Sequence, residues 1–176
     1  MKALIAATLV AASVAAIPAL SHAQVSPDYY GSAGYGAMRT DGADIGVLQG
    51  RLGARLTPHF GVEGEVGVGV TDDKTYVAGA PVTVELKHQA AAYAVGYLPV
   101  TPKIDLLARA GYGTTKLKGS AAGLSSSESQ DSWNYGVGAQ YKLDDKNGLR
   151  ADWTKSEFTN SKADADTLAV SYVRKF

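Results

Sequence analysis

Apolar and polar residues alternate along most of this chain. After Gln24, eight stretches of 10 to 14 residues show this period of two, and residues typical of turns separate them. A period of two places successive side chains on opposite faces of a β-strand, whereas a helix repeats its apolar residues every three or four positions. The pattern predicts an all-β protein whose strands lie at residues 29–39, 45–56, 60–71, 86–98, 103–116, 132–143, 149–158 and 165–176.

The two faces of these predicted strands suit a wall between lipid and water. In the sixth stretch Trp133 and Tyr141 share an apolar face with valine and alanine, while Gln140 lies on the other face with two glycines. In the third, valines alternate with glycines and with Glu63 and Glu65. A charge that faces lipid near the middle of a membrane costs about 2–4 kcal/mol, so the charged face is expected to line an interior. The sequence therefore predicts an eight-stranded antiparallel up-and-down transmembrane β-barrel. A secreted soluble β-sandwich is the alternative.

The connections between the predicted strands alternate in length. Residues 57–59, 99–102 and 144–148 form short links that contain proline or glycine, whereas residues 72–85 and 117–131 form long polar ones. Short turns at one rim and longer loops at the other are typical of outer-membrane barrels, where the short side faces the periplasm. We expect both termini at the short-turn rim, because the number of strands is even.

The first 23 residues have the composition of an export signal. Lys2 provides a positive start, an alanine-rich apolar run follows, and Ser21-His22-Ala23 places small residues before a cleavage site at Gln24. We therefore expect residues 1–23 to be a cleaved signal peptide and residues 24–176 to form one outer-membrane barrel domain. The apolar run is shorter than the roughly 18 residues of a spanning helix, which disfavours an N-terminal anchor.

Charge and cysteine content narrow the classes further. The formal net charge of the whole chain is +0, and losing Lys2 with the signal leaves it near −1, so no basic surface for nucleic acid is expected. The chain has no cysteine, which argues against a disulfide scaffold and against thiolate metal sites.

Charged residues of both signs fall on the predicted inward faces. Glu63 and Glu65 share one face two residues apart, and their repulsion requires nearby cations. One register of the preceding hairpin places Arg55 opposite Glu63, and the other places Arg51 opposite Glu65. The expected interior charge network consists of Arg51, Arg55, Glu63, Glu65, Asp105, Arg109, Arg150 and Asp152.

This network has two interpretations. A closed set of ion pairs would fill the interior, whereas an open set would line a narrow aqueous path for small solutes or ions. Side chains nearly fill an eight-stranded barrel, which favours the closed interior.

Aromatic residues occur near the ends of the predicted strands. Tyrosine and tryptophan gather where lipid meets water, so we expect two membrane-interface girdles. Their predicted members are Phe60, Tyr97, Tyr141 and Phe176 at the periplasmic rim, and Tyr112, Trp133 and Phe158 at the outer rim.

The sequence offers no constellation for catalysis. Small barrel enzymes can use a histidine and a serine near a rim, but only a chance approach of His88 to Ser132 or Ser156 would imitate that pair. We expect a protein that is not an enzyme and that needs no cofactor and no metal ion. A lipid-modifying enzyme is the least favoured alternative.

Two segments resemble the small outer-membrane β-barrel family that includes opacity-protein-like and OmpA/OmpX-type barrels. Residues 56–65 resemble its second-to-third-strand hairpin, with a Gly-x-Glu-Gly-Glu run at 61–65, and residues 171–176 resemble its C-terminal assembly signal, which includes Tyr172 and Phe176. Arg174 departs from the family, which usually has an aromatic or apolar residue at that place.

This resemblance implies an integral protein of the Gram-negative outer membrane with a structural or surface-interaction role. The partners it implies are outer-membrane lipids and lipopolysaccharide, with periplasmic chaperones and the outer-membrane assembly machinery during biogenesis. An extracellular loop partner of unknown identity is expected, and no nucleic acid. A small barrel has no need to associate, so we expect a monomer.

Overall fold

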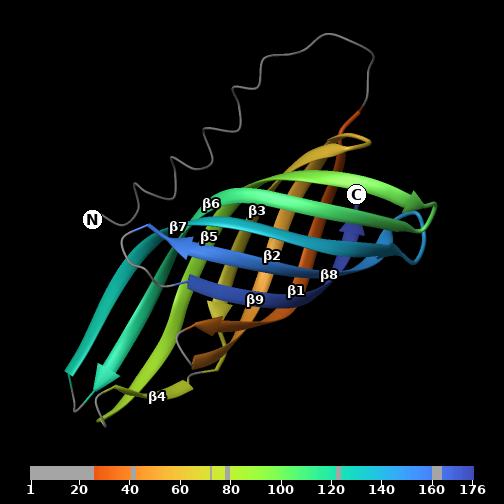
Figure 1. Cartoon of the computed structure of the whole chain (residues 1–176). Coiled ribbons are helices and arrows are strands. Elements are labelled where there is room, and N and C mark those ends of the chain that lie inside the picture. The colour runs from red at the N-terminus through yellow and green to blue at the C-terminus, as the bar shows by residue number, and fades with distance from the viewer. Residues whose placement is uncertain (1–25, 41–42, 72, 78–79, 122–123, 160–163) are drawn as a thin grey trace.

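The computed structural model describes residues 26–40, 43–71, 73–77, 80–121, 124–159 and 164–176 (Figure 1). The expected signal peptide, residues 1–23, lies outside the described residues. The described chain forms the strands β1 (Asp28–Thr40), β2 (Ala43–Thr57), β3 (Phe60–Gly69), β4 (Asp73–Val77), β5 (Ala80–Thr101), β6 (Ile104–Ala121), β7 (Leu124–Lys142), β8 (Asn147–Phe158) and β9 (Asp164–Lys175).

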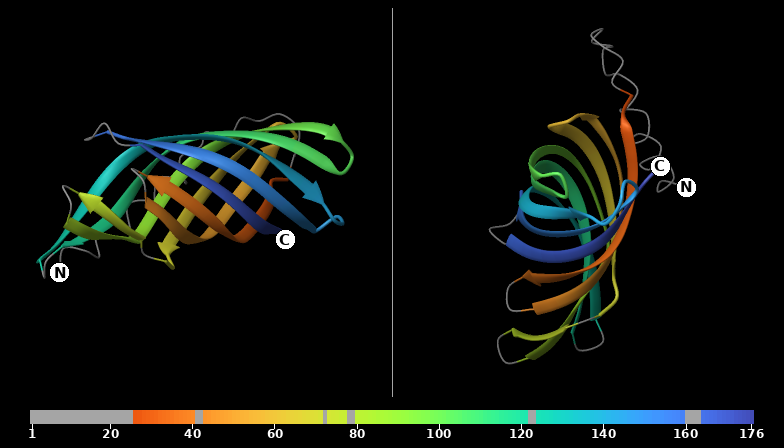
Figure 2. Two further views of the ribbon diagram at one scale, coloured as in Figure 1. Left: turned by 60° about the horizontal axis from the view of Figure 1, so that its bottom comes forward. Right: turned by 90° about the vertical axis from the view of Figure 1, so that its right-hand side faces the viewer.

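Eight of these strands close into a barrel. The sheet order is β3-β2-β1-β9-β8-β7-β6-β5-β4, and a further pairing of β3 with β5 closes the ring. All pairings are antiparallel between neighbours in the ring, and Figure 2 shows the strands wrapped around a common axis. The predicted eight-stranded antiparallel barrel is confirmed. Within the described residues, β4 pairs with β5 alone and lies outside the ring.

The two rims of the barrel differ. At one rim β2 turns into β3 at Pro58–His59, β5 into β6 at Pro102–Lys103, and β7 into β8 at residues 143–146. The end of β9 lies at the same rim, where the Lys175 backbone N–H donates a hydrogen bond to the Lys146 carbonyl oxygen at 2.7 Å. We call this end the short-turn rim and the opposite end the long-hairpin rim.

The expected long loops at residues 72–85 and 117–131 are largely strand instead. β5, β6 and β7 continue past the other strands at the long-hairpin rim, and β4 adds to β5 there (Figure 1). β6 and β7 stay paired out to Ala121 and Leu124. The prediction of loops was wrong because residues 117–131 lack apolar alternation and the alternation of Val82, Val84 and Leu86 is short. The strand conformation of both stretches comes from backbone pairing with the neighbouring strands. We call β4 with these projecting parts of β5, β6 and β7 the hairpin extension.

Burial alternates along the barrel wall as the sequence pattern predicts. On β9, Leu168 and Val170 are exposed on the outer surface, whereas Thr167, Ala169 and Ser171 are buried inside. The wall is therefore apolar outside and mostly small or polar inside. The described residues contain no helix that is long and apolar enough to cross a membrane.

Candidate functional site

Side chains that meet inside the barrel form the candidate site, and they lie in layers along the barrel axis. Nearest the short-turn rim is a cluster around Asp105 of β6. Its carboxylate contacts Arg55 Nη1 at 2.8 Å and Lys142 Nζ at 3.0 Å. The Arg55 guanidinium also lies 4.4 Å above the Tyr97 ring. This rim cluster ties β2, β6 and β7 together.

The next layer is a fully buried network of three arginines and three carboxylates. Arg51 of β2 joins two of the acids: its Nε is 2.7 Å from Glu65 and its Nη1 is 2.8 Å from Asp152 of β8. Arg109 of β6 reaches the same two carboxylates, at 2.8 Å and 3.1 Å. Each arginine therefore bridges strands on opposite sides of the bore, and the layer closes across the interior.

Glu63 is the third acid of this layer, which we call the central network. Its carboxylate lies 2.6 Å from Arg150 Nη1 and 3.2 Å from Arg109 Nη1, and it accepts a hydrogen bond from the Tyr30 hydroxyl at 2.9 Å. Arg150 also lies 3.4 Å from Asp152. With three positive and three negative groups, the central network is neutral. A buried charge is tolerated only when it is paired in this way.

The strand register decides which arginine meets which glutamate. Arg51 lies directly opposite Glu65, and Gly53 lies opposite Glu63. The alternative register, which would place Arg55 opposite Glu63, does not occur. Arg55 instead lies opposite Gly61 and pairs with Asp105, so removing Arg55 would leave Asp105, and not Glu63, with fewer partners.

Three inward tyrosines belong to the site: Tyr30 and Tyr93 were not singled out from the sequence, and Tyr97 was expected on the outer wall. The Tyr30 and Tyr97 hydroxyls are 2.8 Å apart, and Arg109 lies 4.4 Å above the Tyr93 ring. A Cβ on Gly53 would overlap the Tyr30 ring, so only glycine at that position leaves room for the tyrosine. The alternation of faces along β1 and β5 could have indicated these residues, because each of the three tyrosines lies on the same strand face as small or buried side chains.

Beyond the central network the interior is polar and nearly full. Gln49, Gln89, Asn134 and Thr154 line a cavity of about 20 Å³ there. A cavity needs at least about 10–15 Å³ to hold one water molecule, so this one has room for about one.

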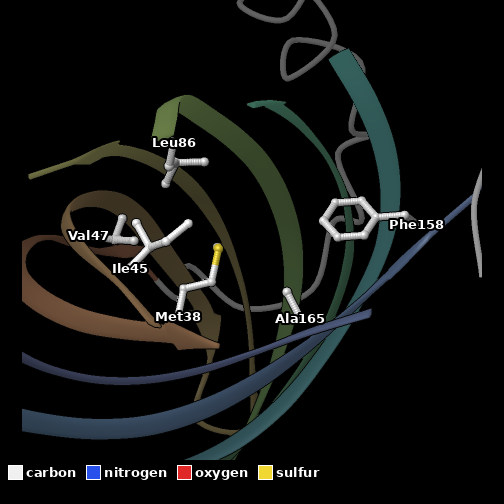
Figure 3. Close-up of a cluster of buried hydrophobic side chains, with 6 residues drawn as sticks. All are labelled: Met38, Ile45, Val47, Leu86, Phe158 and Ala165. Carbon is white, nitrogen blue, oxygen red and sulfur yellow. The ribbon is translucent and has the colours of Figure 1, made fainter. Parts of the chain in front are cut away.

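An apolar layer closes the interior toward the long-hairpin rim. Its side chains come from β1, β2, β5, β8 and β9, and Figure 3 shows them inside the barrel. Its members are Met38, Ile45, Val47, Leu86, Phe158 and Ala165, all buried. The interior is thus filled by ion pairs in its middle and by hydrophobic packing near the long-hairpin rim. The inward charges are recognisable in the sequence, whereas the apolar layer was not predicted.

Five of the seven expected interface aromatics point outward, and two do not. Phe60, Tyr112, Trp133, Tyr141 and Phe176 are exposed on the outer wall. Tyr97 and Phe158 are each only 6% exposed and lie inside the barrel, so their placement in a girdle was wrong. Period-two parity gives the reason: Phe158 shares its face with the buried Asp152 and Thr154, and Tyr97 shares its face with Tyr93.

The remaining residues of interest lie apart from this interior. Tyr172 and Phe176 are exposed, Phe176 to 80%, and the Arg174 guanidinium donates to Asn147 at 2.8 Å. His88 is exposed, whereas Ser132 is buried inside, so the structure does not bring that pair together. No group of three His, Cys, Asp or Glu in the described part of the chain could hold a metal ion.

A closed barrel with an apolar outer wall and a filled polar interior defines the class of small outer-membrane β-barrels. The family model of the outer membrane protein β-barrel domain matches residues 4–176. The chain belongs to this family, which places it in the outer membrane. A search of curated proteins finds no match.

Solved structures share this fold. Ail, the attachment invasion locus protein of Yersinia pestis, solved with the heparin analogue sucrose octasulfate, is 18% identical with a TM-score of 0.62, over 85% of this chain and 99% of Ail. Neisserial surface protein A is 12% identical with a TM-score of 0.61, over 85% of this chain and 97% of that protein. The N-terminal barrel of Pseudomonas aeruginosa OprF is 13% identical with a TM-score of 0.59, over 83% and 96%. At these identities the likeness shows the fold alone.

Proposed function

We propose that this protein is a closed structural barrel of the outer membrane that presents a surface for interaction outside the cell. The observation that carries the proposal is the interior, in which the central network and the apolar layer succeed one another along the bore. The central network joins β2, β3, β6 and β8 across the bore through ion pairs of 2.6–3.4 Å. Such an interior adds stability to the wall and leaves little room for a solute.

The proposed orientation follows the asymmetry of the rims. The short-turn rim faces the periplasm and the hairpin extension projects from the cell, where it offers the surface for an extracellular partner. Residues 1–23 direct export, and Tyr172 with Phe176 carries the C-terminal signal for the assembly machinery. The outward aromatics, such as Tyr112 and Tyr141, lie at the two membrane interfaces. The folded protein acts as a monomer and has no enzymatic role.

Single-channel conductance tests the closed interior against the alternative of a narrow channel. The protein is purified from outer membranes, its folded state is verified by gel mobility with and without heating, and it is inserted into a planar bilayer. We expect no discrete openings from the natural chain.

A widened variant provides the control. Glu63→Ala with Arg150→Ala removes one carboxylate and one guanidinium, so the central network stays neutral, and Phe158→Ala opens the apolar layer. This triple variant is expected to conduct, which shows that openings can be detected. Reproducible openings of the natural barrel would overturn the proposal and favour a pore lined by the charges.

A further inference from the structure

One edge of the hairpin extension has no neighbouring strand among the described residues. β7 pairs with β6 from Leu124 onward, whereas β8 pairs with β7 only from Ser132 onward. Figure 1 shows the extension projecting from the rim, with β7 on one side and β4 on the other. Residues 125–129 of β7, which we call the open edge, therefore have a described neighbour only on the side of β6.

The direction of the backbone groups along the open edge follows from one hydrogen bond. The Thr159 N–H donates to the Asp131 carbonyl oxygen at 2.8 Å from the side of β8. In an antiparallel strand the N–H and C=O of one residue point to the same side, and those of the next residue point to the other. Counting back from Asp131 by twos, the backbone groups of Ser129, Ser127 and Ser125 point away from β6. The open edge thus presents three donors and three acceptors.

The open edge lacks the features that usually keep an edge strand from pairing. Natural edges carry lysine, proline or a β-bulge, each of which hinders the approach of another strand. Residues 125–129 read Ser-Ser-Ser-Glu-Ser, and their pairing with β6 runs through consecutive partners without a shift of register. The open edge is therefore a regular strand that is suited to adding one more strand to the sheet.

The open edge is complementary to itself. A two-fold rotation axis perpendicular to the sheet and centred on Ser127 places Ser127 opposite Ser127 of a second copy, and Ser125 opposite Ser129. Every outward backbone group then meets a partner, since each of these three pairs exchanges two hydrogen bonds. The one charged residue of the segment, Glu128, lies opposite Ser126 in this register, so like charges do not stand directly opposite each other.

This pairing is possible only between two membranes that face each other. The wall of a barrel runs parallel to the barrel axis, so a two-fold axis perpendicular to the sheet inverts the second barrel. Barrels in one membrane instead have their β7 strands running in the same direction, which excludes antiparallel pairing of the two edges. In the register centred on Ser127, the Asp131 residues of the two copies are about 27 Å apart along the strand, or about 20 Å along the normal at a 40° tilt.

We infer that the open edge of β7 pairs with the open edge of a second copy in a facing membrane, and that the protein thereby joins two outer-membrane surfaces. The inference rests on the proposed orientation, in which the hairpin extension lies outside the cell. Each barrel remains a monomer in its own membrane. One pair of short edges binds weakly, but many copies on two surfaces act together and raise the overall strength.

Vesicle association with charge-changed edges tests the inference. The full barrel is folded into phosphatidylcholine vesicles, verified by gel mobility, and energy transfer is measured between a batch with donor lipid and a batch with acceptor lipid. We expect transfer with the natural chain and an at least fivefold loss with Ser127→Lys or Ser127→Glu, because the two-fold axis places equal charges opposite each other. Mixing a batch of Ser127→Lys with a batch of Ser127→Glu is expected to restore transfer to within twofold. Thr75→Lys on β4, at the other edge of the extension, is the matched control and is expected to stay within twofold.

Cysteine cross-linking tests the register and the facing membranes. The natural chain has no cysteine. Hydrogen-bonded partners have Cα atoms about 5.5 Å apart, which lies within the range of a disulfide bond. We expect a disulfide-linked dimer when vesicles that carry Ser125→Cys are mixed with vesicles that carry Ser129→Cys, and none when both batches carry Ser125→Cys.

Each contrary result overturns a defined part of the inference. No transfer by the natural chain, or no rescue in the mixed batches, would overturn self-pairing. Equal transfer to vesicles without protein would indicate binding to lipid, and cross-links that need both variants in one vesicle would overturn the facing membranes. A membrane-impermeant maleimide that fails to label Ser127→Cys on intact cells would overturn the proposed orientation. The conductance experiment does not involve the open edge, so failure of the closed interior is distinguishable from all of these.

Discussion

Glu63 offers the sharpest test of the central network. Glu63→Gln keeps the shape of the side chain but removes its charge, which leaves three arginines facing only Glu65 and Asp152. Arg150 suffers most, because Glu63 is its closest partner at 2.6 Å and Asp152 is 3.4 Å away. Breaking a buried ion pair by removing one partner costs about 3–5 kcal/mol, and the lost charge acceptor for the Tyr30 hydroxyl acts in the same direction.

Urea unfolding of the barrel in detergent measures this cost. The chain has two tryptophans, Trp133 and Trp153, and both lie on the outer wall, where their fluorescence reports contact with detergent. For a slope of about 2 kcal/mol per molar urea, a loss of 3–5 kcal/mol lowers the midpoint by about 1.5–2.5 M. Glu157→Gln, on the exposed outer surface, is the matched control and is expected to leave the midpoint nearly unchanged.

A double-mutant cycle separates ion pairing from packing. Arg150→Met alone is expected to destabilise the barrel strongly, whereas adding it to Glu63→Gln restores the charge balance and part of the stability. A midpoint shift below about 0.3 M for Glu63→Gln, or strictly additive effects in the cycle, would refute the reasoning; the first corresponds to about 0.6 kcal/mol at the assumed slope.

Three further predictions address the wall, the apolar layer and a turn. Val170→Arg places a charge on the outer wall and is expected to cost about 2–4 kcal/mol if that surface faces the middle of a membrane, measured as loss of folded barrel on heating-dependent gels; full assembly would contradict an embedded wall. Phe158→Ala removes the largest member of the apolar layer and is expected to cost about 3–5 kcal/mol in urea unfolding, well above the exposed Tyr141→Ala, and equal costs would argue against that packing. Hydrogen bonds from the Asn147 side chain and from the Lys146 backbone lower the pKa of Asp144, so its contribution to stability is complete above the ordinary carboxyl pKa and disappears as the pH falls through the lowered value. Asp144→Ala is therefore expected to lower the unfolding midpoint at pH 7, and the difference from the natural chain should vanish in acid; a difference that does not depend on pH would contradict this assignment.

Much of the architecture follows from local pattern. The alternation in residues 132–143 and 165–176 predicts both the strands and their two faces, because successive side chains of a strand must point to opposite sides. The tight turns at Pro58 and Pro102 are predictable for the same local reason, since proline and its neighbours favour turns. The inward position of charged residues follows from the high cost of exposing a charge to lipid.

The alternation of faces along a strand also indicates which aromatic residues point inward, although their positions near strand ends suggested the membrane interface. Phe158 and Tyr97 occur near strand ends, where aromatics often meet the membrane interface, yet their parity places them inside with Asp152 and Tyr93. The face of the strand decides burial, whereas closeness to a rim does not. The apolar layer was predictable from parity, but only once each strand had been placed correctly.

The contacts of the interior depended on the closed barrel. The sequence alone determined that Glu63 and Glu65 face inward and need cations, but two registers satisfied that need equally. Closure selected the register in which Arg51 meets Glu65, and it brought Arg150 of β8 to Glu63 of β3, 87 residues away along the chain. The hairpin extension likewise exists because paired backbones continue beyond the barrel wall. Side-chain alternation is a local property of each strand, whereas register and contacts across the bore depend on how all the strands pair, and only the tertiary structure decided them.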